Sequence, residues 1–299
     1  YGDFVADWIE QFCRLPEECF AGNQGDPMVI RPWQREALRG IYATRPDGVR
    51  RHRLAIYSTG RKNGKSGLAA GIALAALGEQ MGGQVISAAA DRDQARIIWK
   101  QADKMVELNP ELDLAKGGYI KRYAHVLEDT RTGSVYRTVS SDAYTKEGLS
   151  PSLVICDELH AFPTRALYDV LDLAQGTRRN PLMLVVTTAG VMSTKTEDES
   201  ILFELFNYGE SILRGETQDP SFYMAWWGGD EKVKDYRDPR YFIPANPGLG
   251  DILDPEEIAS KALKTPESEF RTKRGNEFTP VESFWLPAGT WEACLNPLT

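Results

Sequence analysis

The fold class of this 299-residue chain is decided by the stretch LAIYSTGRKNGKSG, which runs from Leu54 to Gly67. Its first four residues are apolar, as in a buried strand, and its last residues open a helix of small side chains. Gly60 and Gly64 lie in the loop between the two. The free amides and the dipole at a helix N-terminus attract anions. The order of strand, glycine-containing loop and helix therefore predicts a phosphate-binding loop.

The loop matches the pattern G-x-x-x-x-G-K-[ST] except at its first glycine. That place is taken by Thr59, and Gly60 follows one residue later. At the other end, we expect Gly64 to let the backbone approach a phosphate and Lys65 to reach the β- and γ-phosphates of ATP. Ser66 is then the Mg²⁺ ligand. The alternative is a strand-to-helix turn that binds nothing.

A second apolar strand ends in two acids. The residues Leu153-Val-Ile-Cys precede Asp157 and Glu158, and open α/β sheets bind their ligands at this carboxyl edge. We expect Asp157 to hold Mg²⁺ through water. Glu158 is expected to orient and deprotonate the attacking water, so that the site hydrolyses ATP rather than transferring phosphate to a second substrate. Two surface acids at the end of a strand are the alternative.

The order of predicted elements along the chain indicates the architecture. Apolar strands alternate with helices, which is typical of an α/β fold with a mainly parallel central sheet and helices on both faces. A pair of strands is expected within 119–140, and a strand near 222–226 returns to the sheet. A further strand (85–89) is expected between the loop and the acidic strand. This insertion and the Glu after the Asp resemble the additional-strand, catalytic-Glu class of P-loop ATPases.

The character of the sequence changes after about residue 228. The chain becomes rich in Asp, Pro and Gly and then helical at 254–264 and 267–277. We therefore expect a P-loop ATPase core at 1–228 and a lid or linker subdomain at 229–299. No apolar run approaches the roughly 20 residues that a membrane span requires, and a cytoplasmic location is the default expectation.

Charge is distributed unevenly along the chain. The whole chain carries a formal net charge of −8, which argues against a general coat for nucleic acid. The segment from Arg31 to Lys65, however, contains ten Arg or Lys residues and only two acids, a local net charge of 10 − 2 = +8. Phosphate binding and a solvated basic surface both explain this cluster. The four cysteines form no CxxC pair, so we expect reduced structural thiols rather than a zinc site.

The order of motifs resembles a known family, the ATPase domain of the large terminase subunit of tailed double-stranded DNA phages, of the HK97-like type. The resemblance covers about residues 28–290. Its motifs, in chain order, are Pro32-Trp33-Gln34, Gly60-Arg61-Lys62-Asn63-Gly64-Lys65-Ser66, Ala89-Ala90-Asp91-Arg92-Asp93-Gln94-Ala95, Pro151 through Asp157-Glu158-Leu159-His160, and Arg179-Asn180-Pro181-Leu182 leading to Thr187-Thr188-Ala189-Gly190. Ala245-Asn246-Pro247 and Phe270-Arg271 through Asn276 also look like the family.

The resemblance implies roles for individual residues. Trp33 and Gln34 look like an adenine-recognition motif. The loop residues Gly60, Lys62 and Asn63 would line the phosphates. Arg61 lies where terminases carry an arginine that contacts the phosphates or responds to the nucleotide. Thr187 and Thr188 resemble the motif that couples hydrolysis to movement. An arginine from a neighbouring subunit would complete the site, with Arg178, Arg179 and Lys146 as candidates; surface charge is the alternative for all three.

The resemblance also implies partners. These are double-stranded DNA, held through its backbone without sequence readout, the portal protein and the small terminase subunit. The chain would form a homo-oligomeric ring on the portal and be a monomer in isolation, in the host cytoplasm at the viral procapsid. The family's RNase H-like nuclease domain would begin where this chain stops. We therefore expect a linker at 284–299 and no nuclease activity.

Two other functions fit parts of the sequence. A helicase-like, DNA-dependent ATPase is suggested by Asp157-Glu158-Leu159-His160, but it would need a second series of strands and helices, for which the residues after Gly190 are too few. A non-catalytic nucleotide-binding module would keep the phosphate loop without using Glu158 for turnover. A small-molecule kinase is disfavoured because Glu158 serves water best.

Overall fold

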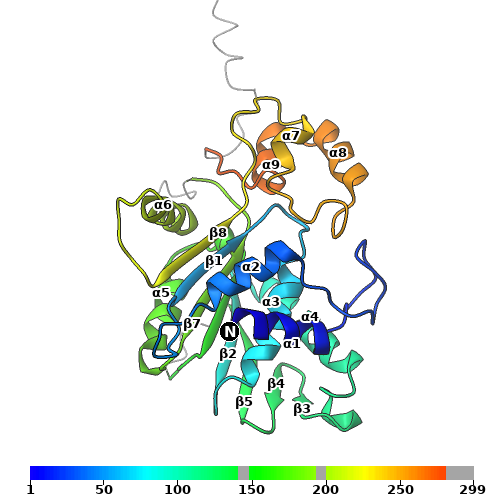
Figure 1. Ribbon diagram of the computed structural model, residues 1–299, viewed down its shortest axis with the longest axis vertical. Helices are drawn as coiled ribbons and strands as arrows, with labels where there is room; N and C mark the ends of the chain where they lie inside the picture. The colour runs from blue at the N-terminus through cyan, green and yellow to red at the C-terminus, as the bar shows by residue number, and fades with distance from the viewer. Residues whose placement is uncertain (141–147, 193–199, 281–299) are drawn as a thin grey trace, which may run out of the picture.

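The protein is built around a central sheet of eight strands. A computed structural model describes residues 1–140, 148–192 and 200–280. The strand order is β3-β4-β5-β2-β6-β7-β1-β8, and Figure 1 shows the sheet running through the middle of the molecule. The strands are β1 (Leu54–Ser58), β2 (Gln84–Ala89), β3 (Ile120–Arg122), β4 (Val126–Asp129), β5 (Ser134–Ser140), β6 (Leu153–Asp157), β7 (Leu182–Thr187) and β8 (Phe222–Trp226).

The six strands from β5 to β8 in the sheet order are parallel, and β3 and β4 add an antiparallel edge. Every residue of β6 and β7 is buried, as continuous apolar strands covered on both faces should be. The mainly parallel sheet and the return of the 222–226 strand are thus confirmed. The segment 119–140 forms three strands rather than the predicted pair, because the short β3 extends the β4–β5 hairpin.

The strand next to the phosphate loop differs from the expectation. The sequence predicts a further strand (85–89) between the loop and the acidic strand. In the sheet that place is taken by β7, which pairs with both β1 and β6, while β2 lies on the far side of β6. The order of strands along the chain does not fix their order in the sheet, because a helical crossover such as α3 can pass over neighbouring positions.

Helices cover both faces of the sheet (Figure 1). One core joins the sheet to α1, α2, α3 and α4, and the other joins it to α5 and α6. None of the described helices is both long and apolar enough to cross a bilayer. The helices of the two layers are α1 (Gly2–Phe12), α2 (Pro32–Ile41), α3 (Lys65–Leu77), α4 (Arg92–Leu108), α5 (Ala166–Leu173) and α6 (Ile201–Leu213).

A third, smaller core lies beyond the carboxyl ends of β1 and β8. It joins α7 (Pro239–Phe242), α8 (Pro255–Lys264) and α9 (Glu267–Lys273) through side chains such as Tyr241 and Phe270, and Figure 1 shows these helices grouped at one end of the molecule. Helix α9 ends at Lys273, whereas the sequence predicts an end at 277. Asn276 has a left-handed backbone conformation (φ 50°), which a continuing helix could not contain. The predicted linker at 284–299 lies outside the described residues.

Candidate active site

The phosphate loop has the backbone of an anion cradle. Gly64 caps α3 in the left-handed conformation (φ 75°), and Lys62 is left-handed as well (φ 77°). Within the described ranges, the backbone amides of residues 62–66 donate to no acceptor of the protein. Consecutive free amides at the start of a helix are the arrangement that binds phosphate.

Lys65 stands over this loop. Its side chain is only 7% exposed, and Nζ donates to the carbonyl oxygens of Thr59 (2.9 Å) and Gly60 (3.2 Å). Burial lowers the pKa of Lys65 to about 8, and the charges of Glu158 and Asp157 oppose that shift. The loop lysine and the two acids of β6 therefore lie close enough to act on one another. Thr59, which stands where the usual pattern has glycine, accepts a hydrogen bond from Lys65 through its backbone carbonyl oxygen.

Gly60 is explained by its neighbours in the smaller subdomain. Its amide donates to the carbonyl of Ala245 (2.8 Å), and a Cβ at this position would lie 2.5 Å from Oδ1 of Asn246. Asn63 Nδ2 donates to the same Oδ1 (2.9 Å), and the Gly248 amide donates to Asn63 Oδ1 (3.0 Å). The loop thus needs a glycine at 60 because the subdomain packs directly against it.

The two acids at the end of β6 have opposite environments. Asp157 is 2% exposed and accepts one hydrogen bond in the described structure, from Gln94 Nε2 (3.3 Å). Burial and the charge of Glu158 raise the pKa of Asp157 to about 7. Burial also disfavours the charged form of Glu158. The hydrogen bond from His160 and the charge of Lys65 outweigh it, however, and lower its pKa to about 2.

Glu158 is held in a strained and well-bonded position. It has left-handed dihedral angles (φ 51°, ψ 54°), a cost that side chains other than glycine bear at functional sites. Its Oε2 lies 3.1 Å from His160 Nδ1 and accepts from Thr188 Oγ1 (3.2 Å) and the Thr188 amide (3.4 Å). In the described part of the chain Oε1 has no hydrogen-bond partner. One carboxylate oxygen is therefore fixed while the other remains available to a water molecule.

A pocket of about 130 Å³ opens beside these groups. Glu158, His160 and Thr188 meet there with Arg61 and with residues from the start of α4. The complete lining is Arg61, Ala90, Asp91, Gln94, Glu158, His160, Ala161, Thr188 and Lys273. The predicted phosphate loop, the buried Asp157 and the half-buried Glu158 thus meet beside a small pocket at the carboxyl edge of the sheet.

Comparison with known proteins decides the family. The sequence model described as "Terminase large subunit, ATPase domain" matches residues 32–203. The chain belongs to this family. It is 31% identical over 303 residues to the "Terminase, large subunit" of Enterobacteria phage HK97, a match that covers 98% of this chain and 56% of the relative. The chain therefore spans about half the length of that curated relative.

Solved structures agree with this assignment. The crystal structure of the HK97 bacteriophage large terminase superposes with a TM-score of 0.76 at 29% identity, over 98% of this chain and 58% of the other. A large terminase from a thermophilic bacteriophage, solved in complex with ADP, shares the fold (TM-score 0.53, 10% identity, 82% of this chain and 52% of the other). The family, the P-loop α/β fold and the ATPase class predicted from the sequence are confirmed.

The terminase residues expected at the adenine lie beside the loop. Gln34 is 3% exposed, its Oε1 accepts from the Arg31 amide (3.0 Å), and its Nε2 would lie 3.9 Å from a Cβ placed at Gly64. Trp33 stacks on Tyr57 with ring centroids 6.2 Å apart. Trp33 therefore packs α2 against β1, the strand that leads into the loop, and in doing so sets the position of Gln34.

The segment that the resemblance predicts to couple hydrolysis to movement makes hydrogen bonds on both sides. Thr187 Oγ1 donates to the Thr188 carbonyl (2.9 Å) and lies 3.3 Å from His160 Nδ1, while Thr188 bonds Glu158. The next residue, Ala189, donates its amide to Asn276 Oδ1 (2.7 Å). His160, Gln94 and Asn276 are site residues to which sequence reasoning gave no role, although each lies in a stretch that resembles the family.

The candidates for a neighbour's arginine differ in availability. Arg178 donates from Nε to the Ser150 carbonyl (2.8 Å) and from Nη2 to the Gly82 carbonyl (3.0 Å), so that it fastens the starts of two strands. That engagement argues against Arg178 as a residue that reaches another subunit. Arg179 is exposed, and Lys146 lies outside the described residues.

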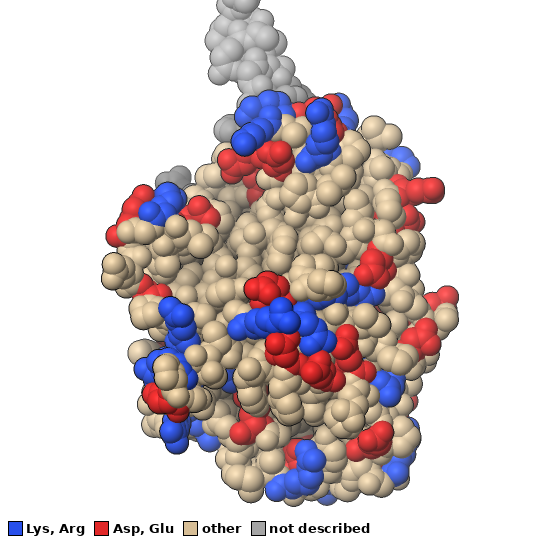
Figure 2. Space-filling view, viewed as in Figure 1, with Lys and Arg blue, Asp and Glu red and all other residues tan. Residues whose placement is uncertain are grey.

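Five of the ten basic residues between Arg31 and Lys65 form ion pairs with acids of the described structure. Arg35 pairs with Asp7 (2.7 Å) and Glu10 (2.8 Å), and Arg39 with Asp3 (3.0 Å). Figure 2 shows the blue and red side chains of this face lying next to one another. The other pairs are Arg31–Asp251, Arg45–Asp47 and Arg50–Glu79. For these arginines the structure favours ion pairs with the protein's own acids over phosphate binding.

Proposed function

We propose that this chain hydrolyses ATP to drive double-stranded DNA into a viral procapsid. The observation that carries the proposal is a meeting of residues at the carboxyl edge of the sheet: Lys65 begins α3 after β1, and Asp157 and Glu158 lie at the end of β6, one strand away. A cationic loop residue beside one buried and one half-buried carboxylate is typical of a nucleotide-hydrolysing site. The solved ADP complex of a thermophilic phage terminase with the same fold supports nucleotide binding here.

We assign the nucleotide contacts to the groups that line the loop. Gln34, positioned by Trp33, would recognise the adenine. The free amides of the loop and Lys65 would bind the β- and γ-phosphates, and Arg61, which lines the pocket, would contact the phosphates or respond to their loss. The remaining nucleotide-binding residues in this proposal are Gly60, Lys62, Asn63, Gly64, Ser66, Thr187 and Thr188.

The residues present fit a magnesium ion. Asp157 is buried and accepts one amide hydrogen bond in the described structure, and its pKa stays raised although Lys65 lies nearby, so a divalent cation would supply positive charge that the carboxylate still needs. Ser66 opens α3 at the same edge of the sheet. We assign Ser66 and Asp157 as the metal-holding residues. A bound Mg²⁺ would neutralise negative charge on the β- and γ-phosphates.

Glu158 is the catalytic residue of the proposed reaction. Its low pKa keeps it ionised at neutral pH, His160 and Thr188 fix Oε2, and Oε1 would accept the proton of the attacking water. When the γ-phosphate leaves, the contact between Glu158 and Thr188 connects the reaction to the strand end that Asn276 ties to the smaller subdomain. We propose that residues 229–299 act as a lid and linker for the core at 1–228.

Partners follow from the proposed role in packaging. They are the backbone of double-stranded DNA, the portal protein, the small terminase subunit and further copies of this chain in a ring, in the host cytoplasm at the procapsid. An arginine from the neighbouring copy would complete each site, and Arg179 is the remaining described candidate. A helicase is less well supported, because in the described residues after Gly190 only β8 adds a strand to the sheet.

The substitution Glu158→Gln tests the catalytic assignment. The amide keeps the size and hydrogen-bonding shape of the side chain but cannot accept the water's proton, so we expect ATP turnover to fall about 10²-fold or more. Nucleotide affinity, measured with a fluorescent ATP analogue, should remain within a few-fold. The matched control is Glu111→Gln, which changes an exposed glutamate and should leave turnover unchanged.

Two results would contradict this assignment. Turnover that survives in Glu158→Gln would favour a non-catalytic nucleotide-binding module. Loss of nucleotide binding together with turnover would mean that Glu158 builds the binding site. Lys65→Ala, in contrast, should lose ATP-dependent function altogether because it removes the cation that reaches the phosphates. ATPase activity that is indifferent to DNA, portal and oligomerisation alike would count against the packaging role.

A further inference from the structure

Helix α4 carries a row of basic side chains on its outer surface. Arg92, Arg96 and Lys100 follow one another at intervals of four residues, which places them on one face of the helix. We call these three residues the α4 stripe. The opposite face is buried in the core through residues such as Ile98 and Ala102. At about 1.5 Å of rise per residue, the stripe is about 12 Å long.

The charges of the α4 stripe are not used within the described structure. Across residues 1–140, 148–192 and 200–280, none of the three forms an ion pair, whereas the arginines of α2 are paired with acids. Like charges four residues apart destabilise a helix by about 0.2–0.5 kcal/mol per pair. A helix that keeps two such pairs without local compensation, apart from the neighbouring Asp93, favours an anionic partner.

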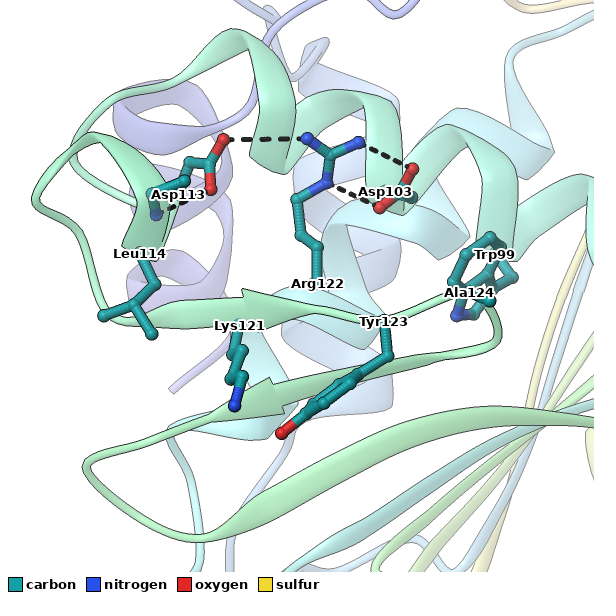
Figure 3. Close-up of a pocket in the computed structure, with 9 residues that line it drawn as sticks. Trp99, Asp103, Asp113, Leu114, Lys121, Arg122, Tyr123 and Ala124 are labelled. Carbon is teal, nitrogen blue, oxygen red and sulfur yellow. Dashed lines mark hydrogen bonds and ion pairs between the residues drawn. The ribbon is translucent and has the colours of Figure 1, made fainter.

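The acids on the surface beside the stripe form ion pairs with neighbouring cations. It contains an open pocket of about 720 Å³, shown in Figure 3, which Trp99 of α4 lines together with residues of β3. Arg122 in this pocket is bonded to Asp103 (2.7 Å) and lies 3.6 Å from Asp113. Together with Lys116, which lies 3.9 Å from Asp113, Arg122 offsets these two acids and so reduces their repulsion of a negatively charged ligand.

Helix α4 also touches the candidate active site. It begins directly after β2, at the carboxyl edge of the sheet, and its first turn places Gln94 Nε2 3.3 Å from Asp157 Oδ2. Asp91 and Gln94 both line the small pocket beside Glu158. One rigid element therefore bears the unpaired cations on its outer face and a contact to the proposed magnesium-binding acid at its beginning.

We propose that the α4 stripe binds backbone phosphates of double-stranded DNA. The inference rests on the proposed packaging function and names the surface through which the ATPase domain would hold its substrate. Duplex DNA presents a negative charge about every 1.7 Å along its axis, so a straight row of cations about 12 Å long meets several phosphates. Because Arg and Lys contact only the backbone in this arrangement, the binding is independent of sequence.

The test replaces all three cations at once. The triple variant Arg92→Gln, Arg96→Gln, Lys100→Gln is compared with the control Lys232→Gln, Lys261→Gln, Lys264→Gln, which removes three exposed cations from the smaller subdomain. Binding of a labelled DNA duplex is followed by fluorescence anisotropy between about 50 and 200 mM salt. Thermal unfolding of both variants confirms that each is folded, and removal of like charges from α4 should not lower its stability.

We expect the stripe variant to bind at least about tenfold more weakly at low salt. The slope of log K against log salt should become shallower by about 0.9 for each lost phosphate contact, up to about 2.7 for three. The control should retain most of the affinity and the slope. Equal binding by the stripe variant and the unmodified chain would overturn the stripe while leaving the packaging function intact.

Two further outcomes separate the inference from the function on which it rests. If the unmodified chain binds no duplex even at the lowest salt, both the stripe and the proposed handling of DNA by this domain are wrong. If the stripe variant binds DNA normally but changes its sedimentation, the cations meet the acidic surface of a second copy of the chain, and the DNA assignment is overturned.

Discussion

Asp157 and Glu158 are adjacent in sequence and differ in nearly every physical respect. Asp157 ends β6 with its carboxylate buried and bonded to one amide group, whereas Glu158 turns out of the strand and gathers donors from His160 and Thr188. Burial raises the pKa of Asp157 to about 7, and hydrogen bonds and Lys65 lower that of Glu158 to about 2. Neighbouring acids with separated pKa values can serve as metal ligand and base in one site.

The raised pKa of Asp157 makes a prediction for stability. The pKa is about 7 in the folded chain and 3.8 for an ordinary aspartate, so the folded state holds this proton more tightly. Its contribution to stability is complete at low pH and is lost as the pH rises from about 4 to about 7. Without nucleotide or metal, Asp157→Asn should therefore raise the free energy of unfolding at pH 8, by an amount on the order of 2 kcal/mol.

The same variant should lose this advantage in acid. Below about pH 4 the wild-type carboxyl is protonated in the folded chain and largely protonated in the unfolded chain, and urea unfolding should give nearly equal stabilities for the two proteins. Metal-dependent nucleotide binding should be weakened by Asp157→Asn at pH 8. A variant that is less stable than the wild type at pH 8 would show that Asp157 stabilises the fold and is not a strained metal ligand.

The phosphate loop is held as much by the smaller subdomain as by its own helix. Gly60, Arg61 and Asn63 make hydrogen bonds to Ala245, Lys273, Asn246 and Gly248. Asn276 then joins the ends of β1 and β7 by accepting from Ser58 Oγ (3.1 Å) and the Ala189 amide (2.7 Å). Through Asn276, the last described segment of the chain thus holds together the ends of β1 and β7, next to the candidate site.

The close packing of Gly60 against the smaller subdomain predicts that adding one methyl group at this position is destabilising. In Gly60→Ala, the new Cβ would lie 2.5 Å from Asn246 Oδ1 and 2.8 Å from the Arg274 carbonyl, so the loop and the subdomain must separate. We expect a loss of about 1–3 kcal/mol in stability and weaker nucleotide binding. Calorimetric unfolding and nucleotide titration measure both effects.

The control is Gly176→Ala, whose Cβ would enter open space with no atom within 4 Å. It should leave both quantities nearly unchanged. If Gly60→Ala behaves like this control, the subdomain does not constrain the loop, and the lid proposal loses its structural basis.

At the scale of the whole molecule, the sheet determines which motifs meet. Apolar runs and their punctuation predicted the strands, and the residue types after β1 and β6 predicted Lys65, Ser66, Asp157 and Glu158 as site residues. The place of β7 between these strands was not predicted, because strand order depends on how the crossovers pack. The roles of Asn246 and Asn276 depend on contacts between segments far apart in the chain, which leave no local pattern.

Ion pairs, too, depend on contacts that the sequence alone does not reveal. The excess of arginines between Arg31 and Lys65 is visible in the sequence, but their pairing with acids of α1 and with Asp251 is not. The α4 stripe is harder to recognise in the sequence because Asp93 lies among its cations and Asp103 and Glu107 follow them. In the structure Arg122 forms ion pairs with Asp103 and Glu107, and the stripe has no ion-pair partner among the described residues.

A structure of the chain with Mg²⁺ and a non-hydrolysable ATP analogue would show whether Lys65, Ser66, Asp157 and Glu158 form one nucleotide site. We predict that the phosphates lie in the loop at 60–66 and that the ion lies about 2.0–2.1 Å from Ser66 Oγ, with Asp157 bound to it through water. Glu158 Oε1 should face the γ-phosphate across one water molecule. Phosphates bound outside that loop, or an ion remote from Ser66 and Asp157, would contradict the account.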